Sequence, residues 1–152
     1  MPLIRTVHAE PGREVSMSEE EWLQEENALS ERVTMLCQMY GGSAKNVGSS
    51  DFSADDEMGQ HDLNRYEKAR KEALKIAILL KDAFYRDSAL HCVLDMCMKA
   101  NDLKFATAIA KAITVETIQD AIVEQHGEFF VLSERDGRLH PTASAGLLPT
   151  LK

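Results

Sequence analysis

Apolar residues recur at helical spacing through most of the second half of the chain, from residue 62 to residue 126. They stand three or four positions apart, which places them on one face of a helix, and alanine is frequent among them. Breaks near residues 86–87, 101–102 and 114–117 divide this stretch into four short helices. The pattern predicts a mainly α-helical fold, a helical bundle or short α-solenoid of about five helices with a small C-terminal β-hairpin.

These helices form two pairs with the same pattern, about 33 residues apart, a spacing close to the period of helix-turn-helix solenoids. Each pair has a small residue, an alanine four positions later, an aliphatic residue, a break and then an aspartate. Small residues four positions apart let a helix approach its neighbour closely. The corresponding residues are Ala73 and Ala106, Ala77 and Ala110, Leu80 and Ile113, Asp87 and Asp120, and Leu90 and Val123. The period indicates a stacked helical repeat, and a chance match between alanine-rich amphipathic helices is the alternative.

The segments KIAILL…YRDSAL and AIAKAI…IQDAIVE carry this pattern within about residues 71–124. They resemble tetratricopeptide-like or HEAT-like helical repeats. The Trp, Gly, Tyr and Pro of a full tetratricopeptide consensus are absent, so the resemblance points to the repeat class and to no specific protein. It implies a binding scaffold built from stacked helix pairs.

One strongly patterned helix, residues 18–40, lies outside the repeat. Ser18 and Glu21 form an S-x-x-E capping box, and the glutamates at 19–21 lie where the helix dipole favours negative charge. Its apolar stripe consists of Trp22, Leu29, Val33, Leu36 and Tyr40. We expect these five residues to bind a partner protein, by covering a groove of the helix pairs or by joining a second copy in a homodimer.

The remaining segments carry weaker patterns. Residues 1–17 are predicted as an extended segment, and residues 41–61, rich in Gly, Ser and Asp, as a flexible linker that begins with a Gly-Gly helix stop. Residues 127–152 are predicted as a hairpin that turns at Asp136-Gly137 and continues into a loose tail. Residues 3–7 could add a strand to this hairpin. With helix 18–40 and the helix pairs of 62–126, these segments form one predicted domain.

Charge and composition argue against several classes of partner. The chain has 25 acidic and 17 basic residues and a formal charge of −8, so it repels a phosphate backbone and no nucleic acid partner is expected. The basic residues between 65 and 75 alternate with glutamates, which is typical of a solvated helix face. No segment approaches the ~20 apolar residues of a membrane span, and residues 1–17 lack a signal-peptide core. We expect a cytoplasmic protein with reduced cysteines and no membrane partner.

No group of residues in the sequence carries an enzyme's signature. His91 and Asp95 are spaced like two metal ligands on one helix, but no third ligand is evident, and packing at a helix edge is favoured for the histidine. The sequence therefore predicts a non-enzymatic protein-binding module or adaptor without cofactor or metal, for example a small chaperone for a secreted bacterial protein. The alternatives are a small helical metal-dependent enzyme centred on His91 and Asp95, and a secreted effector with an export signal in residues 1–16.

Overall fold

The structure, a computed structural model, describes residues 4–10 and 13–142, with side-chain surroundings from residue 17 onward. It is mainly helical, which confirms the predicted fold class. Two short antiparallel hairpins flank the helices: β1 (Ile4–Glu10) pairs with β2 (Arg13–Ser18), and β3 (Phe130–Leu132) pairs with β4 (Leu139–Pro141). The helices are α1 (Glu19–Met39), α2 (Gly41–Val47), α3 (Glu57–Ala77), α4 (Ala83–Lys99), α5 (Leu103–Ala112) and α6 (Glu116–His126).

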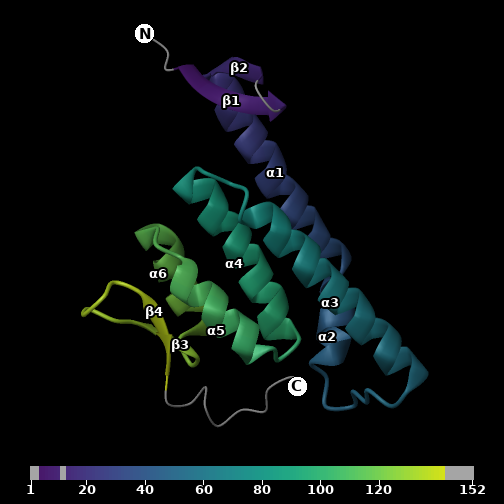
Figure 1. The fold of residues 1–152 in the computed structure, drawn as a ribbon. Coiled ribbons are helices and arrows are strands. Elements are labelled where there is room, and N and C mark those ends of the chain that lie inside the picture. Colours follow the sequence, from purple (N-terminus) through teal and green to yellow (C-terminus); the bar gives the residue numbers. More distant parts are fainter. Residues whose placement is uncertain (1–3, 11–12, 143–152) are drawn as a thin grey trace.

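Helix α4 lies at the centre of the molecule and contacts α1, α3, α5 and α6 (Figure 1). The core between these helices is made mostly of Ala, Ile, Leu and Val, with Tyr66 and Phe130 as its largest fully buried side chains. The many buried alanines let the helix axes approach closely. The molecule is therefore held together by helix packing around α4, and the β1–β2 hairpin extends from one end of α1.

Helix α1 confirms the prediction of a capped helix over 18–40. Ser18 is its N-cap and its hydroxyl accepts a hydrogen bond from the backbone N–H of Glu21, while Tyr40 is the C-cap. Glutamates fill the first turn, where they complement the helix dipole. The helix packs its apolar face against α3 and α4 of the same chain.

The prediction of a flexible linker over 41–61 was wrong at both of its ends. Helix α1 does end just before the Gly-Gly pair, as predicted, but the pair then opens α2, and α3 begins at Glu57. Ala44 and Val47 hold α2 in place because they are buried in the core between α2, α3 and α4. Gly48 then passes so close to α4 that a Cβ on it would lie 1.9 Å from the carbonyl oxygen of Lys99. Tertiary packing thus overrides the low helix propensity of the two glycines.

The predicted helix pairs are α3–α4 and α5–α6. Three of the five corresponding positions are buried in both pairs: the two alanines and the aliphatic residue that ends each first helix. The other two positions differ. Asp87 is buried and Asp120 is exposed, and Leu90 is buried whereas Val123 is half-buried. The repeated pattern therefore reflects how the first helix of each pair and the following turn are packed. The second helices of the two pairs differ in the burial of their corresponding residues.

The turns between the paired helices are each held by a buried carboxylate from a neighbouring helix. Glu26 of α1 accepts hydrogen bonds from the backbone N–H groups of Lys81 and Asp82, at 2.6 and 2.7 Å. Asp87 of α4 accepts from the backbone N–H groups of Thr114 and Val115, both at 2.8 Å. The bonded backbone positions of the two turns correspond to each other in the alignment of the helix pairs. The correspondence between the two pairs thus includes the way each turn is held, by a carboxylate from an earlier helix.

The C-terminal hairpin confirms the prediction made from the Asp-Gly turn. Its strands pair in the register of Leu132 with Leu139, and Phe130 and Leu139 are buried against α5 and α6. The prediction that residues 3–7 could add a strand to it was wrong for the part described, because residues 4–7 lie in β1, which pairs with β2. Leu3 and residues 143–152, which include most of the predicted tail, lie outside the described residues. Among the described residues, no helix is long and apolar enough to cross a membrane.

Candidate functional site

The five residues expected to bind a partner lie along the side of α1 that faces its own chain. Trp22 and Val33 are buried, and the remaining three, Leu29, Leu36 and Tyr40, are half-buried and pack against the core. The guanidinium of Arg65 lies over the Tyr40 ring, 5.4 Å from its centroid. Packing within the chain accounts for this apolar stripe, and a contact of these residues with a partner stays a prediction.

His91 and Asp95, the pair considered as metal ligands, lie together with a third residue that the sequence did not point to. One carboxylate oxygen of Asp95 is 2.8 Å from Nε2 of His126 on α6, and the other is 3.6 Å from Nε2 of His91. Nε2 of His91 also lies 2.9 Å from Oε1 of Gln125. This cluster joins α4 to α6, which is the packing role favoured for the histidine.

A surface groove of about 470 Å³ opens beside this cluster, between α4, the start of α5 and the end of α6. Its polar residues are Asp95, Lys99, Asn101, Gln125 and His126. Met98, Leu103 and Phe129 are its apolar residues. No group of three or more His, Cys, Asp or Glu among the described residues is arranged to hold a metal ion. The groove offers a small mixed surface, and its Asp95 and His126 side chains already join α4 to α6.

The buried polar groups elsewhere are structural. Asp102 caps α5 and accepts hydrogen bonds from the Tyr66 hydroxyl at 2.5 Å and from the Arg70 guanidinium at 2.7 Å. That guanidinium also lies over the Phe105 ring, 3.6 Å from its centroid. Burial raises the pKa of the Cys37 and Cys97 thiols to about 12, so both are protonated at neutral pH and poorly reactive. None of these groups opens onto a described cavity.

An exposed apolar cluster lies at the turn between α3 and α4. Ile78, Leu79 and Phe84 expose 73%, 62% and 56% of their surface. We call these three residues the turn patch. The corresponding positions of the second pair are Lys111, Ala112 and Thr117, and all three are also exposed. The fold therefore places no demand for large apolar side chains at these positions, and the turn patch needs another explanation.

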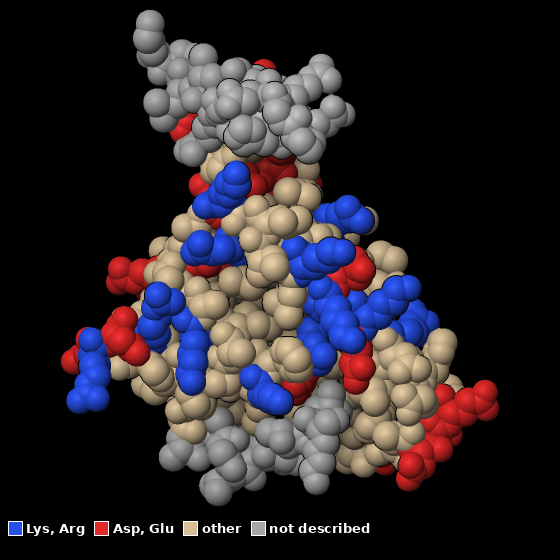
Figure 2. Space-filling view, in the orientation of Figure 1, with Lys and Arg blue, Asp and Glu red and all other residues tan. Residues whose placement is uncertain are grey.

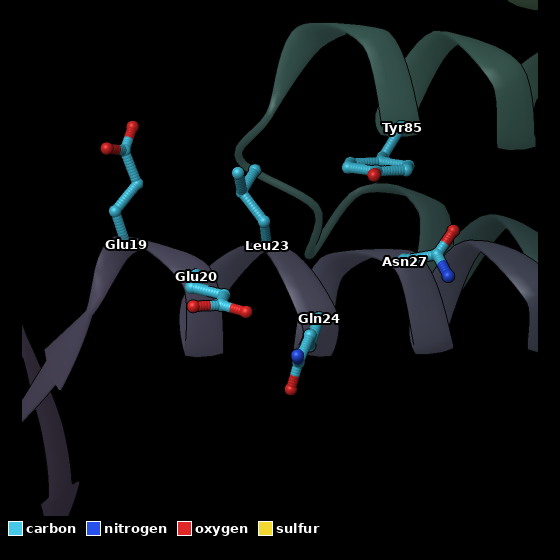
Figure 3. A pocket seen from close by; sticks show the side chains of 6 residues that line it. All are labelled: Glu19, Glu20, Leu23, Gln24, Asn27 and Tyr85. Atoms are coloured by element: carbon cyan, nitrogen blue, oxygen red, sulfur yellow. The ribbon is translucent and has the colours of Figure 1, made fainter. Parts of the chain in front are cut away.

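A shallow groove of about 500 Å³ adjoins the turn patch, between the first turns of α1 and α4. It is lined by Glu19, Glu20, Leu23, Gln24, Asn27 and Tyr85. In Figure 3, Leu23 extends from α1 toward the segment that leads into α4, and the Tyr85 ring lies above Asn27. Glu19 stands upright at the start of α1, whereas Glu20 and Gln24 lie lower on the helix in this view. The Phe84 and Tyr85 rings meet edge to face, with centroids 5.9 Å apart, so Phe84 of the turn patch contacts the lining of the groove.

The charges of the molecule are unevenly distributed. Residues 1–61 contain twelve of the acidic residues and four of the basic ones, whereas the rest of the chain contains thirteen of each. Figure 2 shows Lys and Arg side chains spread over the face formed by α3 to α6, and acidic side chains gathered at the lower right, over the start of α3. Glu19 and Glu20, which line the groove beside the turn patch, belong to the acidic segment of residues 1–61.

Sequence reasoning missed the turn patch because apolar residues near a helix end are normally assigned to the core. A position-by-position alignment of the two helix pairs could have indicated the turn patch. Lys111 and Thr117 would have shown that positions 78 and 84 are compatible with a polar, exposed residue. Comparison with known proteins finds no matching family model, no matching curated protein and no matching solved structure.

Proposed function

We propose that this protein is a non-enzymatic binding module, an adaptor whose protein partner docks on the turn patch and the adjoining groove. The observation that carries the proposal is the contrast between two equivalent turns. One exposes Ile78, Leu79 and Phe84, and the other exposes a lysine, an alanine and a threonine at the same positions. Large apolar side chains that are exposed together at one turn favour a protein interaction site there.

A chaperone for a secreted bacterial protein is the form of adaptor that this proposal favours, because such a protein must hold an unfolded or partly folded client through exposed apolar side chains. A homodimer in which the patch meets a second copy is the other arrangement considered. Light scattering at micromolar concentration separates the two, since a monomer excludes the homodimer. The secreted-effector alternative predicts that deletion of residues 1–16 abolishes export.

The direct test uses a variant that takes its residues from the second helix pair. I78K/L79A/F84T places at the turn patch the side chains that the chain itself carries at the corresponding exposed positions, so the fold should tolerate it. We expect this variant to capture the partner from host lysate at least tenfold less efficiently than the wild-type protein. The matched control is M35Q/M39Q/M58Q, which removes three other exposed apolar side chains and should capture the partner normally.

Two outcomes would contradict the proposal. Normal capture by the patch variant would show that the turn patch binds no partner. Loss of capture in the methionine control alone would move the binding surface elsewhere on α1 and α3. The metal-dependent enzyme centred on His91 and Asp95 is tested separately by elemental analysis. A stoichiometric bound metal that is lost in His91→Ala would favour the enzyme.

A further inference from the structure

We propose that the partner segment is a basic amphipathic one, which places apolar side chains on the turn patch and Lys or Arg side chains against the carboxylates of the adjoining groove. This inference rests on the proposed binding function and names the chemistry of the occupant. Two independent features of the same region carry it: exposed apolar side chains at the turn that adjoins the groove, and described acidic side chains on the α1 side of that groove.

The apolar strip consists of the turn patch and the apolar side chains of the groove, which meet at Phe84. Phe84 contacts Tyr85, which lines the groove together with Leu23. Ile78 and Leu79 come shortly before the residues whose backbone N–H groups are held by Glu26. Glu26 lies one helical turn beyond Leu23 on α1. The patch and the groove therefore share one rigid framework, in which α1 and the start of α4 are fixed relative to each other.

The negative charge lies on the α1 side of the strip. Glu19 and Glu20 line the groove, and Glu21 and Glu25 belong to the same two turns of α1. The structure gives none of these four carboxylates an ion pair with a basic side chain that it describes. The dipole of α1 offers about half a positive charge here, which four carboxylates exceed.

Among the described side chains, the turn and the first helical turn of α4 contain two basic groups. Lys81 is exposed in the turn, and the nearby Arg86 is paired with Asp87 at 2.9 Å. The described part of this surface thus combines exposed apolar groups with more acidic than basic groups. An amphipathic segment with Lys or Arg beside its apolar face complements both properties, whereas an acidic segment would meet repulsion.

The test measures binding of two synthetic amphipathic helical peptides by fluorescence anisotropy. One is built from Leu and Lys, and the other has the same Leu positions with Glu in place of Lys. We expect the full-length protein to bind the Lys peptide, with weaker binding as salt rises, and to show no comparable binding of the Glu peptide. The E19Q/E20Q variant should bind the Lys peptide about fivefold more weakly.

A matched control removes the same charge from another helix. E116Q/E124Q neutralises two exposed glutamates on α6, one of them also in the first helical turn, and should bind the Lys peptide as the wild-type protein does. Equal binding of the two peptides would overturn the inference. So would equal weakening in E19Q/E20Q and E116Q/E124Q, because that result would mean attraction to the acidic protein as a whole.

The fate of the inference can be separated from that of the proposed function. One outcome keeps the binding function and rejects the basic partner. In it, I78K/L79A/F84T loses the host partner, whereas E19Q/E20Q keeps that partner and binds the two peptides as the wild-type protein does. If I78K/L79A/F84T keeps the host partner, the proposed function itself fails. A dimer that dissociates in I78K/L79A/F84T would show that a second copy occupies the surface, which also overturns the inference.

Discussion

The turn between α3 and α4 and the turn between α5 and α6 are fixed in the same way and present different surfaces. In each, a buried carboxylate from a neighbouring helix accepts two consecutive backbone N–H groups, Glu26 in the first turn and Asp87 in the second. Towards solvent, the first turn shows large apolar side chains and the second shows small or polar ones. The buried carboxylate contacts, which the two turns share, serve the fold. The solvent-facing side chains, which differ, are the candidates for a function.

The neighbours of the two turns differ as well. The residue before Asp87 is Arg86, which reaches forward to Thr114 of the next helix pair. Its counterpart in the second pair is Gln119, whose side-chain amide donates to the carbonyl oxygen of Gly137 in the β3–β4 loop at 2.8 Å. Gln119 thus contacts the C-terminal hairpin, where Arg86 contacts the next helix pair.

Removal of Asp87 should have the largest effect on stability. The side chain is fully buried, and it accepts from two backbone N–H groups and pairs with Arg86. We expect Asp87→Ala to lower the free energy of unfolding by about 3–5 kcal/mol, since it leaves these donors and a cation without their partner. Glu26→Ala should cost less, about 2–3 kcal/mol, because no described cation pairs with Glu26. Urea unfolding measures both.

Asp120→Ala is the control for this comparison, because Asp120 stands at the position equivalent to Asp87 and is exposed. We expect it to change the free energy of unfolding by less than ~0.5 kcal/mol. Similar losses in Asp87→Ala and Asp120→Ala would break the claim that a buried carboxylate holds the second turn.

Alkaline pH should destabilise the fold through groups that belong to the first helix pair and α1. Burial raises the pKa of Cys37 and Cys97 from 9.0 to about 12, and raises the pKa of Tyr66 above its usual range. The folded protein keeps these protons while the unfolded chain releases them, so this contribution is complete below about pH 9 and is lost as the pH rises further. At pH 10 the two thiols should lower the free energy of unfolding by about 3 kcal/mol.

The measurement is urea unfolding between pH 7.5 and pH 10 in the presence of a reductant, with wild-type protein and Cys37→Ala. The variant starts from a lower stability, since it loses a packed side chain, but its stability should fall less steeply with pH. Parallel pH profiles for the two proteins would show that the Cys37 thiol is not shielded from water in the folded state.

Much of this architecture could be predicted from the sequence because it depends on local signals. The Ser18 cap and the glutamates that follow it define the start of α1, and the recurrence of paired alanines defines the two helix pairs. The Asp-Gly turn predicts the C-terminal hairpin, because its left-handed Gly137, with φ of 67°, suits glycine. Each of these signals lies within a few residues of the element that it specifies.

The remaining features depend on contacts between distant segments. Helix α2 begins with two glycines and is stabilised by burial of Ala44 and Val47, which no local pattern reveals. Asp95 meets His126 across 31 positions of the chain, and Glu26 reaches a turn 55 positions away. The turn patch required both the fold and the comparison of equivalent positions, since an apolar residue becomes informative only when it is known to be exposed.

Gln119→Ala should have a moderate effect on stability. It tests the contact with the C-terminal hairpin, and Arg86→Ala tests the corresponding contact with the next helix pair. The buried amide of Gln119 donates to the carbonyl oxygen of Ile113 at 3.0 Å and to that of Gly137. We expect a loss of about 1–2 kcal/mol, because two carbonyl groups lose a donor. Arg86→Ala should cost about 1 kcal/mol or less, since the arginine is partly solvated. A larger loss in Arg86→Ala would reverse this ranking, as measured by urea unfolding.

The smallest effect on stability is expected from exchanging the solvent-facing residues of the two turns. I78K/L79A/F84T and the reverse exchange K111I/A112L/T117F should each change the free energy of unfolding by less than ~1 kcal/mol, because all six positions are exposed. The reverse exchange also tests what the first turn needs for binding. If apolar side chains alone suffice, adding K111I/A112L/T117F to the I78K/L79A/F84T background should restore binding of the Leu and Lys peptide. We expect no restoration, because the acidic groove lined by Glu19 and Glu20 lies beside the first turn.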